Sequence, residues 1–169
     1  MRLRRENDLL LFTLNLLESR LLLRVFRQLG AHYRLKPGEL DLKAASAWYS
    51  TRGCAAAKMS KQETEEWVEH LHAFKGARLP RLEDWARQLS EIKRAQAHLR
   101  LPMDDASAFL TTLNDYRLLT AARRDIGQKE MDIRSPPQLL KLPPDRQEAL
   151  MEIHLLAWLI EETLRVLQE

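Results

Sequence analysis

The stretch LMEIHLLAWLIEETLRVLQ, residues 150–168, repeats apolar residues at seven-residue steps. Steps of three and four residues bring two such rows to one face of an α-helix. One row holds Leu150, Ala157 and Leu164, the next holds Ile153, Ile160 and Leu167, and Leu155, Leu156, Leu159 and Val166 widen the face. A helix that is apolar over so much of its circumference must be surrounded by other helices. The stretch therefore predicts an all-α fold, a single helical-bundle domain of five or six helices over residues 1–169.

Length and composition are those of one globular domain with an ordinary surface. The chain has 169 residues, of which 45% are hydrophobic and 30% are charged, as in typical soluble domains. Its net charge of +3 is too small to indicate a dedicated nucleic-acid-binding protein. The longest apolar runs fall far short of the roughly 18 residues of a membrane span, and residues 1–5 are basic without a following cleavage signal. We expect a cytoplasmic protein with no membrane contact.

Capping and stop signals divide the rest of the chain into helices. Asn15 with Glu18, and Ser60 with Glu63, have the spacing of a capping box and predict helix starts. We expect helices over 16–33, 41–52, 60–75, 80–100, 103–126 and 145–168, the last two packed antiparallel. The inward residues would include Leu42 and Phe74, and the seam of the 80–100 helix would be Leu82, Trp85, Leu89, Ile92, Gln96 and Leu99.

Two segments fall outside these helices. The apolar run over 9–14 precedes the first cap and predicts a short extended segment. Residues 128–144 are polar and contain two Pro-Pro pairs, which favour turns and loops. We predict a mobile loop there, with a short turn at 138–142.

Two stretches near the C-terminus together resemble a known family. The first, over 109–119, contains leucine, two residues, leucine-asparagine-aspartate, one residue and arginine, at Leu110, Leu113, Asn114, Asp115 and Arg117. The second, over 155–164, approximates a tryptophan-leucine and threonine-leucine pattern at Trp158, Leu159, Thr163 and Leu164. This pairing resembles the bacterial family catalogued as domain of unknown function two-thousand-seventeen. The resemblance implies a helical domain, often actinobacterial and sometimes encoded near the adaptor of the Clp protease, with no enzymatic activity attached to the family.

The polar residues Asn114, Asp115 and Arg117 are the first candidate site. Asn114 and Arg117 lie three residues apart and would share one helix face. One interpretation is a small polar pocket or partner contact in the groove between the last two helices. The other, which we favour, is a buried hydrogen-bond network in which Arg117 satisfies helix ends or a carboxylate and fixes helix register.

The sequence gives little support to metal or cofactor chemistry. Glu69 and His72 have the Glu-x-x-His spacing found in di-iron helical bundles, but that site needs a second copy and two further glutamates. The one cysteine, Cys54, follows Arg52 closely and could be reactive, although a packed cysteine without a role is the favoured interpretation. We predict no metal, no cofactor and no catalytic residues.

A basic helix face is the second candidate site. It comprises Arg87, Lys93, Arg94 and Arg100, with Arg78 and Arg81 just before. Contact with nucleic acid would require these charges to share one surface without neutralising carboxylates. A solvated helix face is the simpler interpretation.

These observations lead to one favoured function and two alternatives. The favoured hypothesis is a non-enzymatic regulatory or adaptor protein that binds an unidentified protein partner through a helical groove or the 128–144 loop. The alternatives are a transcription-associated protein that contacts nucleic acid, and a small-molecule-binding or enzymatic domain with a site near Asn114 and Arg117. The apolar stripe of the last helix leaves homodimer formation open.

Overall fold

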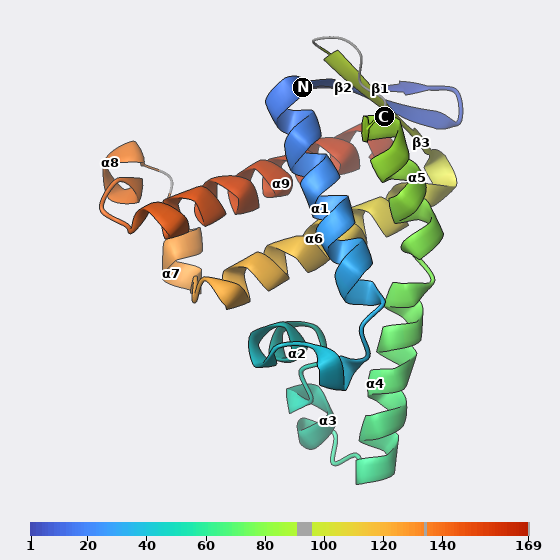
Figure 1. Ribbon diagram of the computed structural model, residues 1–169, viewed down its shortest axis with the longest axis vertical. Helices are drawn as coiled ribbons and strands as arrows, with labels where there is room; N and C mark the ends of the chain where they lie inside the picture. Colours follow the sequence, from blue (N-terminus) through green and yellow to red (C-terminus); the bar gives the residue numbers. More distant parts are fainter. Residues whose placement is uncertain (91–95, 134, 169) are drawn as a thin grey trace.

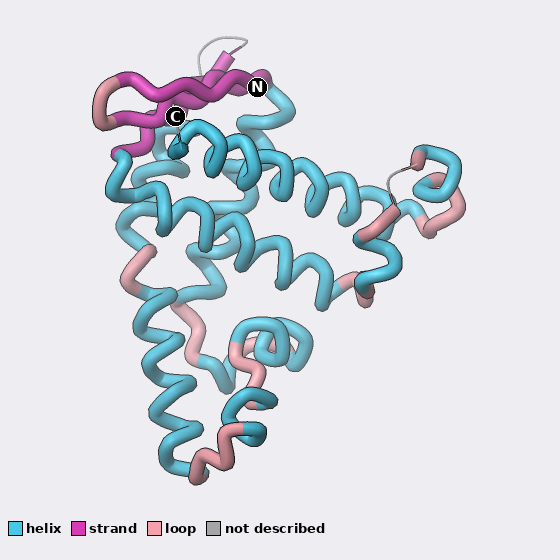
Figure 2. The backbone as a smooth tube through the Cα atoms, turned by 180° about the vertical axis from the view of Figure 1, so that it is seen from behind, coloured by secondary structure: helices cyan, strands magenta, loops and turns pink. Residues whose placement is uncertain are grey.

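A small antiparallel sheet covers one end of a set of helices (Figures 1 and 2). The computed structural model describes residues 1–90, 96–133 and 135–168. The strands are β1 (Arg2–Glu6), β2 (Leu9–Asn15) and β3 (Gln96–Pro102), in the order β1-β2-β3. The larger helices are α1 (Leu16–Tyr33), α4 (Lys61–Gly76), α5 (Leu79–Ser90), α6 (Ala106–Arg123) and α9 (Pro144–Gln168). The protein is therefore α+β, mostly helical but not all-α as predicted.

The sheet corrects two sequence-based expectations. The extended segment over 9–14 is confirmed as part of β2, but β1 and β3 were not predicted. The helix expected over 80–100 ends at Ser90, and Leu99 lies in β3 instead of on a helical seam. In β3, Ala97, Leu99 and Leu101 are buried and their neighbours are exposed, which is the two-residue period of a strand. Ile92 lies outside the described residues.

The predicted helix caps and the predicted helix pair are confirmed. At the start of α1, Asn15 Oδ1 accepts from the Glu18 N–H at 2.9 Å, and Glu18 Oε2 accepts from the Asn15 N–H at 2.8 Å. Ser60 and Glu63 form the same reciprocal pair at α4. Helices α6 and α9 lie side by side and antiparallel in both views (Figures 1 and 2).

A lower lobe in Figure 1 is formed by α2 (Leu42–Trp48), α3 (Arg52–Ala56) and α4. One helix was expected over 41–52, but Leu42–Trp48 and Arg52–Ala56 are separate. Leu42 is 88% exposed, whereas Trp48 is buried. On α4, Phe74 is exposed although we predicted that it faces inward. Lys75 is buried next to it, because a carboxylate in the core partners Lys75. The prediction from apolar character alone was therefore wrong for Leu42 and Phe74.

Residues 128–144 hold two short helices where we predicted a mobile loop. These are α7 (Gln128–Met131) and α8 (Pro136–Leu139), so the turn begins two residues before the predicted 138–142. The segment is held by a second apolar cluster, in which Met131, Leu139 and Leu142 pack against buried residues of α9 and the end of α6.

The main core lies between the sheet and helices α1, α5 and α6. Its centre is aromatic: the ring centroids of Phe12 and Phe109 are 5.1 Å apart, and those of Phe26 and Trp85 are 5.4 Å apart. From the α9 stripe, Leu156, Leu159 and Val166 join this core, whereas Leu164 is 43% exposed. None of the described helices has the length and apolar character needed to cross a membrane.

Candidate functional site

The structure separates Asp115 from the two residues predicted to act with it. Asp115 is buried, whereas Asn114 is exposed and Arg117 is half-buried on α6. Arg117 Nη1 lies 3.5 Å from Asn114 Oδ1, a long contact for a hydrogen bond. Of the three residues, Asp115 alone reaches the interior network.

Asp115 is the acceptor at the centre of a buried network that joins the lower lobe to the core. Its carboxylate accepts from Tyr33 Oη at 2.5 Å, Lys75 Nζ at 2.8 Å and Arg78 Nη1 at 3.0 Å. Its backbone carbonyl accepts from Trp48 Nε1 at 3.0 Å. Burial raises the pKa of Tyr33, as does the Asp115 charge, and burial lowers the pKa of Lys75. The network is a structural junction in which the cations are Lys75 and Arg78 instead of Arg117.

The predicted basic face is divided by the fold. Arg78 is buried against Asp115. Further along α5, Arg81 Nε contacts Asp105 at 2.5 Å and Arg87 pairs with Asp84. These arginines are therefore neutralised locally.

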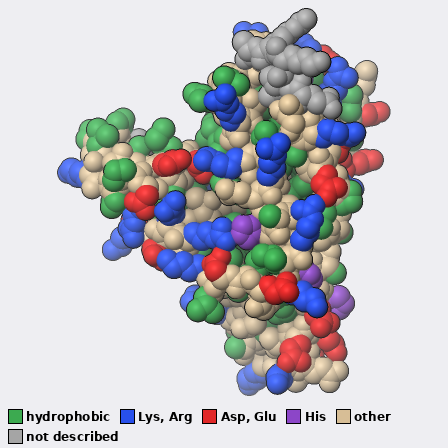
Figure 3. All heavy atoms as spheres, in the orientation of Figure 1, with side chains coloured by type: hydrophobic (Ala, Val, Ile, Leu, Met, Phe, Trp, Pro, Cys, Tyr) green, Lys and Arg blue, Asp and Glu red, His purple; other side chains and the backbone are tan. Residues whose placement is uncertain are grey.

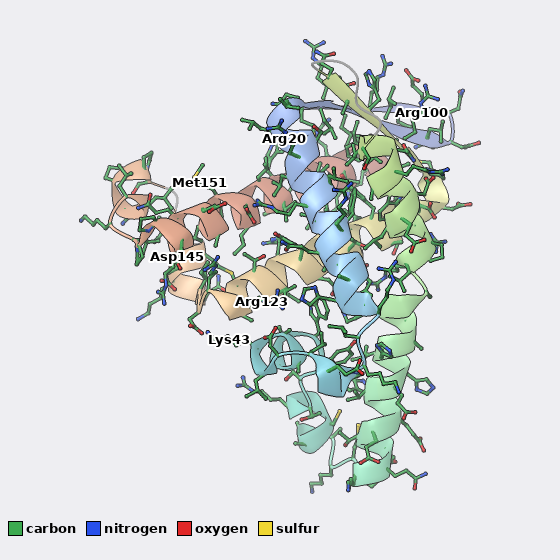
Figure 4. All side chains as sticks on the ribbon, viewed as in Figure 1. Arg20, Lys43, Arg100, Arg123, Asp145 and Met151 are labelled. Carbon is green, nitrogen blue, oxygen red and sulfur yellow. The ribbon has the colours of Figure 1, made fainter. Side chains whose placement is uncertain are left out.

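Of the remaining basic candidates, the structure describes only Arg100. Lys93 and Arg94 lie outside the described residues. Arg100 lies on β3, at the sheet end of the molecule and far from Arg123 at the end of α6 (Figure 4).

The candidate metal ligands lie on α4, and the cysteine lies on α3. Glu69 is exposed, and His72 Nδ1 lies 3.4 Å from Tyr49 Oη. Among the described residues, no group of three His, Cys, Asp or Glu side chains could hold a metal ion. Cys54 is buried on α3.

A hollow of about 210 Å³ lies between α1, α6 and α9. Arginines and carboxylates are interspersed over this face (Figure 3), and in the hollow Arg24 pairs with Glu152 while Arg124 Nη1 lies 3.4 Å from Asp145 Oδ2. Burial raises the pKa of Glu152, and it raises that of Tyr116 to about 12. Because its charged side chains pair with one another, this hollow resembles a contact between helices more than a ligand site.

One edge of the sheet is covered by a side chain and the other is open. The open edge is the candidate site. The outer edge of β3 is covered by Gln88 of α5, whose Oε1 accepts from the Arg100 N–H at 2.9 Å and whose Nε2 donates to the Arg100 carbonyl at 3.2 Å. The side-chain amide thus replaces a neighbouring strand. The other edge belongs to β1, which pairs only with β2 in the part of the chain that the structure describes.

Two hollows flank β1, one on each face of the sheet. The inner hollow, of about 430 Å³, separates β1 from α9 and includes Leu3, Trp158 and Leu159. Trp158 is 41% exposed. The outer hollow, of about 470 Å³, is lined by Met1 and Leu14 and by the polar residues Arg2, Arg4, Thr13, Asn15, Gln96 and His98. Arg2 and Arg4 border both hollows, and the exposed indole of Trp158 borders the inner one. An open strand edge with apolar surface and guanidinium groups beside it is suited to binding an extended chain.

Sequence reasoning missed this site, although a signal was present. In the sequence alone, residues 1–5 indicate only a basic start, but Asn7 and Asp8 form a two-residue turn between β1 and β2. Asn7 has φ of 53°, the left-handed conformation that asparagine tolerates and tight hairpins need. A polar two-residue turn before an apolar run could have predicted the hairpin.

These features describe a mostly helical α+β domain whose sheet, in the residues that the structure describes, has one open edge. The chain belongs to the family described as domain of unknown function (DUF2017), whose model matches residues 1–167. The match covers essentially the whole chain, beyond the two C-terminal stretches that carried the resemblance. No curated protein and no solved structure matches the chain.

Proposed function

We propose that the protein is a non-enzymatic, adaptor-type protein that binds a partner protein by accepting an extended segment along the free edge of β1. The observation that carries this proposal is the contrast between the two sheet edges. Gln88 covers the edge of β3, whereas the edge of β1 borders a hollow shared with α9. Exposed edges otherwise promote aggregation and are commonly covered, so an edge left open beside a groove supports a binding role.

The hairpin geometry identifies the backbone groups that a partner would meet. Because a two-residue turn closes the hairpin, Glu6 and Leu9 form its first hydrogen-bonded pair. The register of β1 and β2 then alternates between hydrogen-bonded and non-hydrogen-bonded pairs. The N–H and C=O groups of Leu3 and Arg5 consequently face away from β2. An added strand would bond to these groups, and main-chain bonds of this kind provide the affinity in β-strand addition.

The groups around the edge are suited to binding instead of bond-breaking chemistry. Trp158 provides exposed apolar surface, and indole rings are common anchors of protein interfaces. On the same wall, Arg165 Nη2 pairs with Glu162 Oε2 at 3.0 Å. This ion pair leaves the groove with balanced charge on its α9 side.

A proline substitution tests the proposal. Arg5→Pro removes an outward N–H while leaving the bonds to β2 in place, and edge strands tolerate proline at such positions. Arg5→Ala is the matched control because it removes the same side chain but keeps the N–H. Tagged wild-type protein and both variants are purified from the native host at moderate salt, and co-eluting proteins are identified by mass spectrometry.

We expect specific partners with the wild type and Arg5→Ala, and their loss with Arg5→Pro. Circular dichroism and thermal unfolding establish that Arg5→Pro is folded. Retention of the same partners by folded Arg5→Pro, or no partner with any form, would overturn the proposal.

A further inference from the structure

We infer that the segment bound at β1 alternates apolar and acidic residues, with the apolar side chains toward α9 and the carboxylates on the outer face of the sheet. This inference rests on the proposed function and specifies the chemistry of the partner. It follows from the register of the sheet, because side chains of an added strand continue the rows that already cross it.

The inner row through Leu3 is apolar, whereas the next inner row places Arg5 opposite Leu10. Leu3 stands opposite Phe12, which is fully buried in the core, so Leu3 marks the inner face of β1. A residue added beside Leu3 would enter the hollow of about 430 Å³ that is bounded by Trp158 and Leu159. Filling this space with an aliphatic side chain would remove apolar surface from water, including part of the exposed indole.

Two of the three outer rows are basic, and the third, which holds Glu6, Leu9 and Pro102, carries a carboxylate. One row across the three strands reads Arg2, Thr13 and His98, and the next reads Arg4, Leu11 and Arg100. Neither row contains a carboxylate. A residue added beside Arg2 or Arg4 would lie next to a guanidinium group, which binds carboxylates with two parallel hydrogen bonds.

The existing partner of Arg4 does not prevent this exchange. Arg4 Nη2 lies 2.8 Å from Glu6 Oε1, but both side chains are at least half exposed. Exposed pairs of this kind contribute little stability. An incoming carboxylate can therefore replace Glu6.

A second copy of β1 fits this edge less well than an acidic strand does. β1 carries three arginines and one carboxylate, that of Glu6. An antiparallel pair centred on Arg4 would place Arg2 opposite Glu6 but Arg4 opposite Arg4, and like charges directly opposite in a sheet are destabilising. Acidic side chains at alternate positions would meet both Arg2 and Arg4 with opposite charge.

A set of matched synthetic peptides tests the inference with the full-length protein. The probe is an end-capped seven-residue peptide that alternates glutamate and valine. One control replaces every glutamate by lysine, and a second has the same composition as the probe with its glutamates and valines in separate blocks. Binding is measured by fluorescence anisotropy at two salt concentrations, and amide exchange of β1 is followed by NMR.

We expect the acidic alternating peptide to bind, to weaken at higher salt, and to slow amide exchange at Leu3 and Arg5. The double variant Arg2→Ala/Arg4→Ala should weaken its affinity at least about tenfold, because it removes both guanidinium groups that would bind the carboxylates bidentately. Arg20→Ala/Arg27→Ala removes two exposed arginines of α1 and should leave the affinity unchanged.

Three results would overturn the inference: equal binding of the basic or block peptide, no binding of the acidic alternating peptide, or tighter binding of a single-stranded oligonucleotide of equal charge that is lost in the Arg2/Arg4 variant. Any of these can occur while Arg5→Pro still removes cellular partners. In that case strand addition stands and the chemistry assigned to the partner is wrong. If Arg5→Pro retains its partners, the proposed function itself fails.

Discussion

Removing the carboxylate of Asp115 should be among the most damaging single substitutions in this protein. Asp115→Ala leaves Lys75 and Arg78 facing each other, with side chains only 8% and 6% exposed and their shared anion gone. It also leaves the Tyr33 hydroxyl without its acceptor. Breaking a buried ion pair by removing one partner costs about 3–5 kcal/mol. Domains are stable by only about 5–15 kcal/mol, so the loss is a large fraction of the total.

Smaller changes in the same network give a graded series. Tyr33→Phe removes one hydrogen bond to a charged group and should cost about 1.5–3 kcal/mol. Lys75→Met removes a cation whose burial already lowers its pKa and leaves the Arg78–Asp115 pair intact, so it should cost the least. Adding Lys75→Met to Asp115→Ala should recover part of the lost stability, because one uncompensated buried charge disappears.

Equilibrium urea unfolding of each variant measures the series. Asn114→Ala is the matched control, since Asn114 is adjacent in sequence, exposed, and in contact only at 3.5 Å with Arg117. A cost for Asp115→Ala within about 1 kcal/mol of that for Asn114→Ala would refute the reasoning, because it would mean that the buried charges are compensated in another way.

Three further outcomes are expected. Gln88→Ala should uncover the edge of β3, lower the free energy of unfolding by about 1–2 kcal/mol and speed amide exchange at Arg100 by NMR; unchanged exchange would argue against the edge cover. Asn15→Ala should cost about 1 kcal/mol in urea unfolding, with Asn114→Ala as the neutral reference. The chain has three tyrosines, and burial raises the pKa of each: Tyr33, Tyr49 and Tyr116. The folded chain therefore keeps the phenol protons of these tyrosines above about pH 10, where the unfolded chain releases them. The contribution of the protonated tyrosines to the free energy of unfolding is complete below that pH and is lost as pH rises. Absorbance titration should show less tyrosinate near pH 10 in the folded protein than in the unfolded chain, and equal titration of the two would contradict the burial argument.

The Asp115 network shows how far sequence reasoning reaches a candidate site. The motif around Asn114, Asp115 and Arg117 pointed to a polar network, and helix spacing suggested that Arg117 takes part. The cations that bind Asp115 are Lys75 and Arg78, 40 and 37 residues away in the chain. No local pattern pairs these residues, because the contact exists only after α4 and α5 pack against α6.

The error in the 80–100 region has a different cause. Leu82, Trp85 and Leu89 are buried on one face of α5 as predicted. The same seven-residue count continues by coincidence to Leu99, although Ala97, Leu99 and Leu101 also fit a two-residue alternation. Short apolar patterns are ambiguous between helix and strand, and here pairing of β3 with β2 decides.

The sequence by itself determined the features that depend on neighbours along the chain. Capping side chains set the starts of α1 and α4, the apolar stripe of α9 required a helical environment, and the motif near Asp115 identified the family. The tertiary structure alone decided which residues meet across the chain: the pairing of β3 with β2, the cover that Gln88 gives to β3, the open edge of β1, and the partners of Asp115. The reason is physical. Caps and helical faces are satisfied within a few residues, whereas strand edges and buried charges are satisfied only by partners that folding brings together.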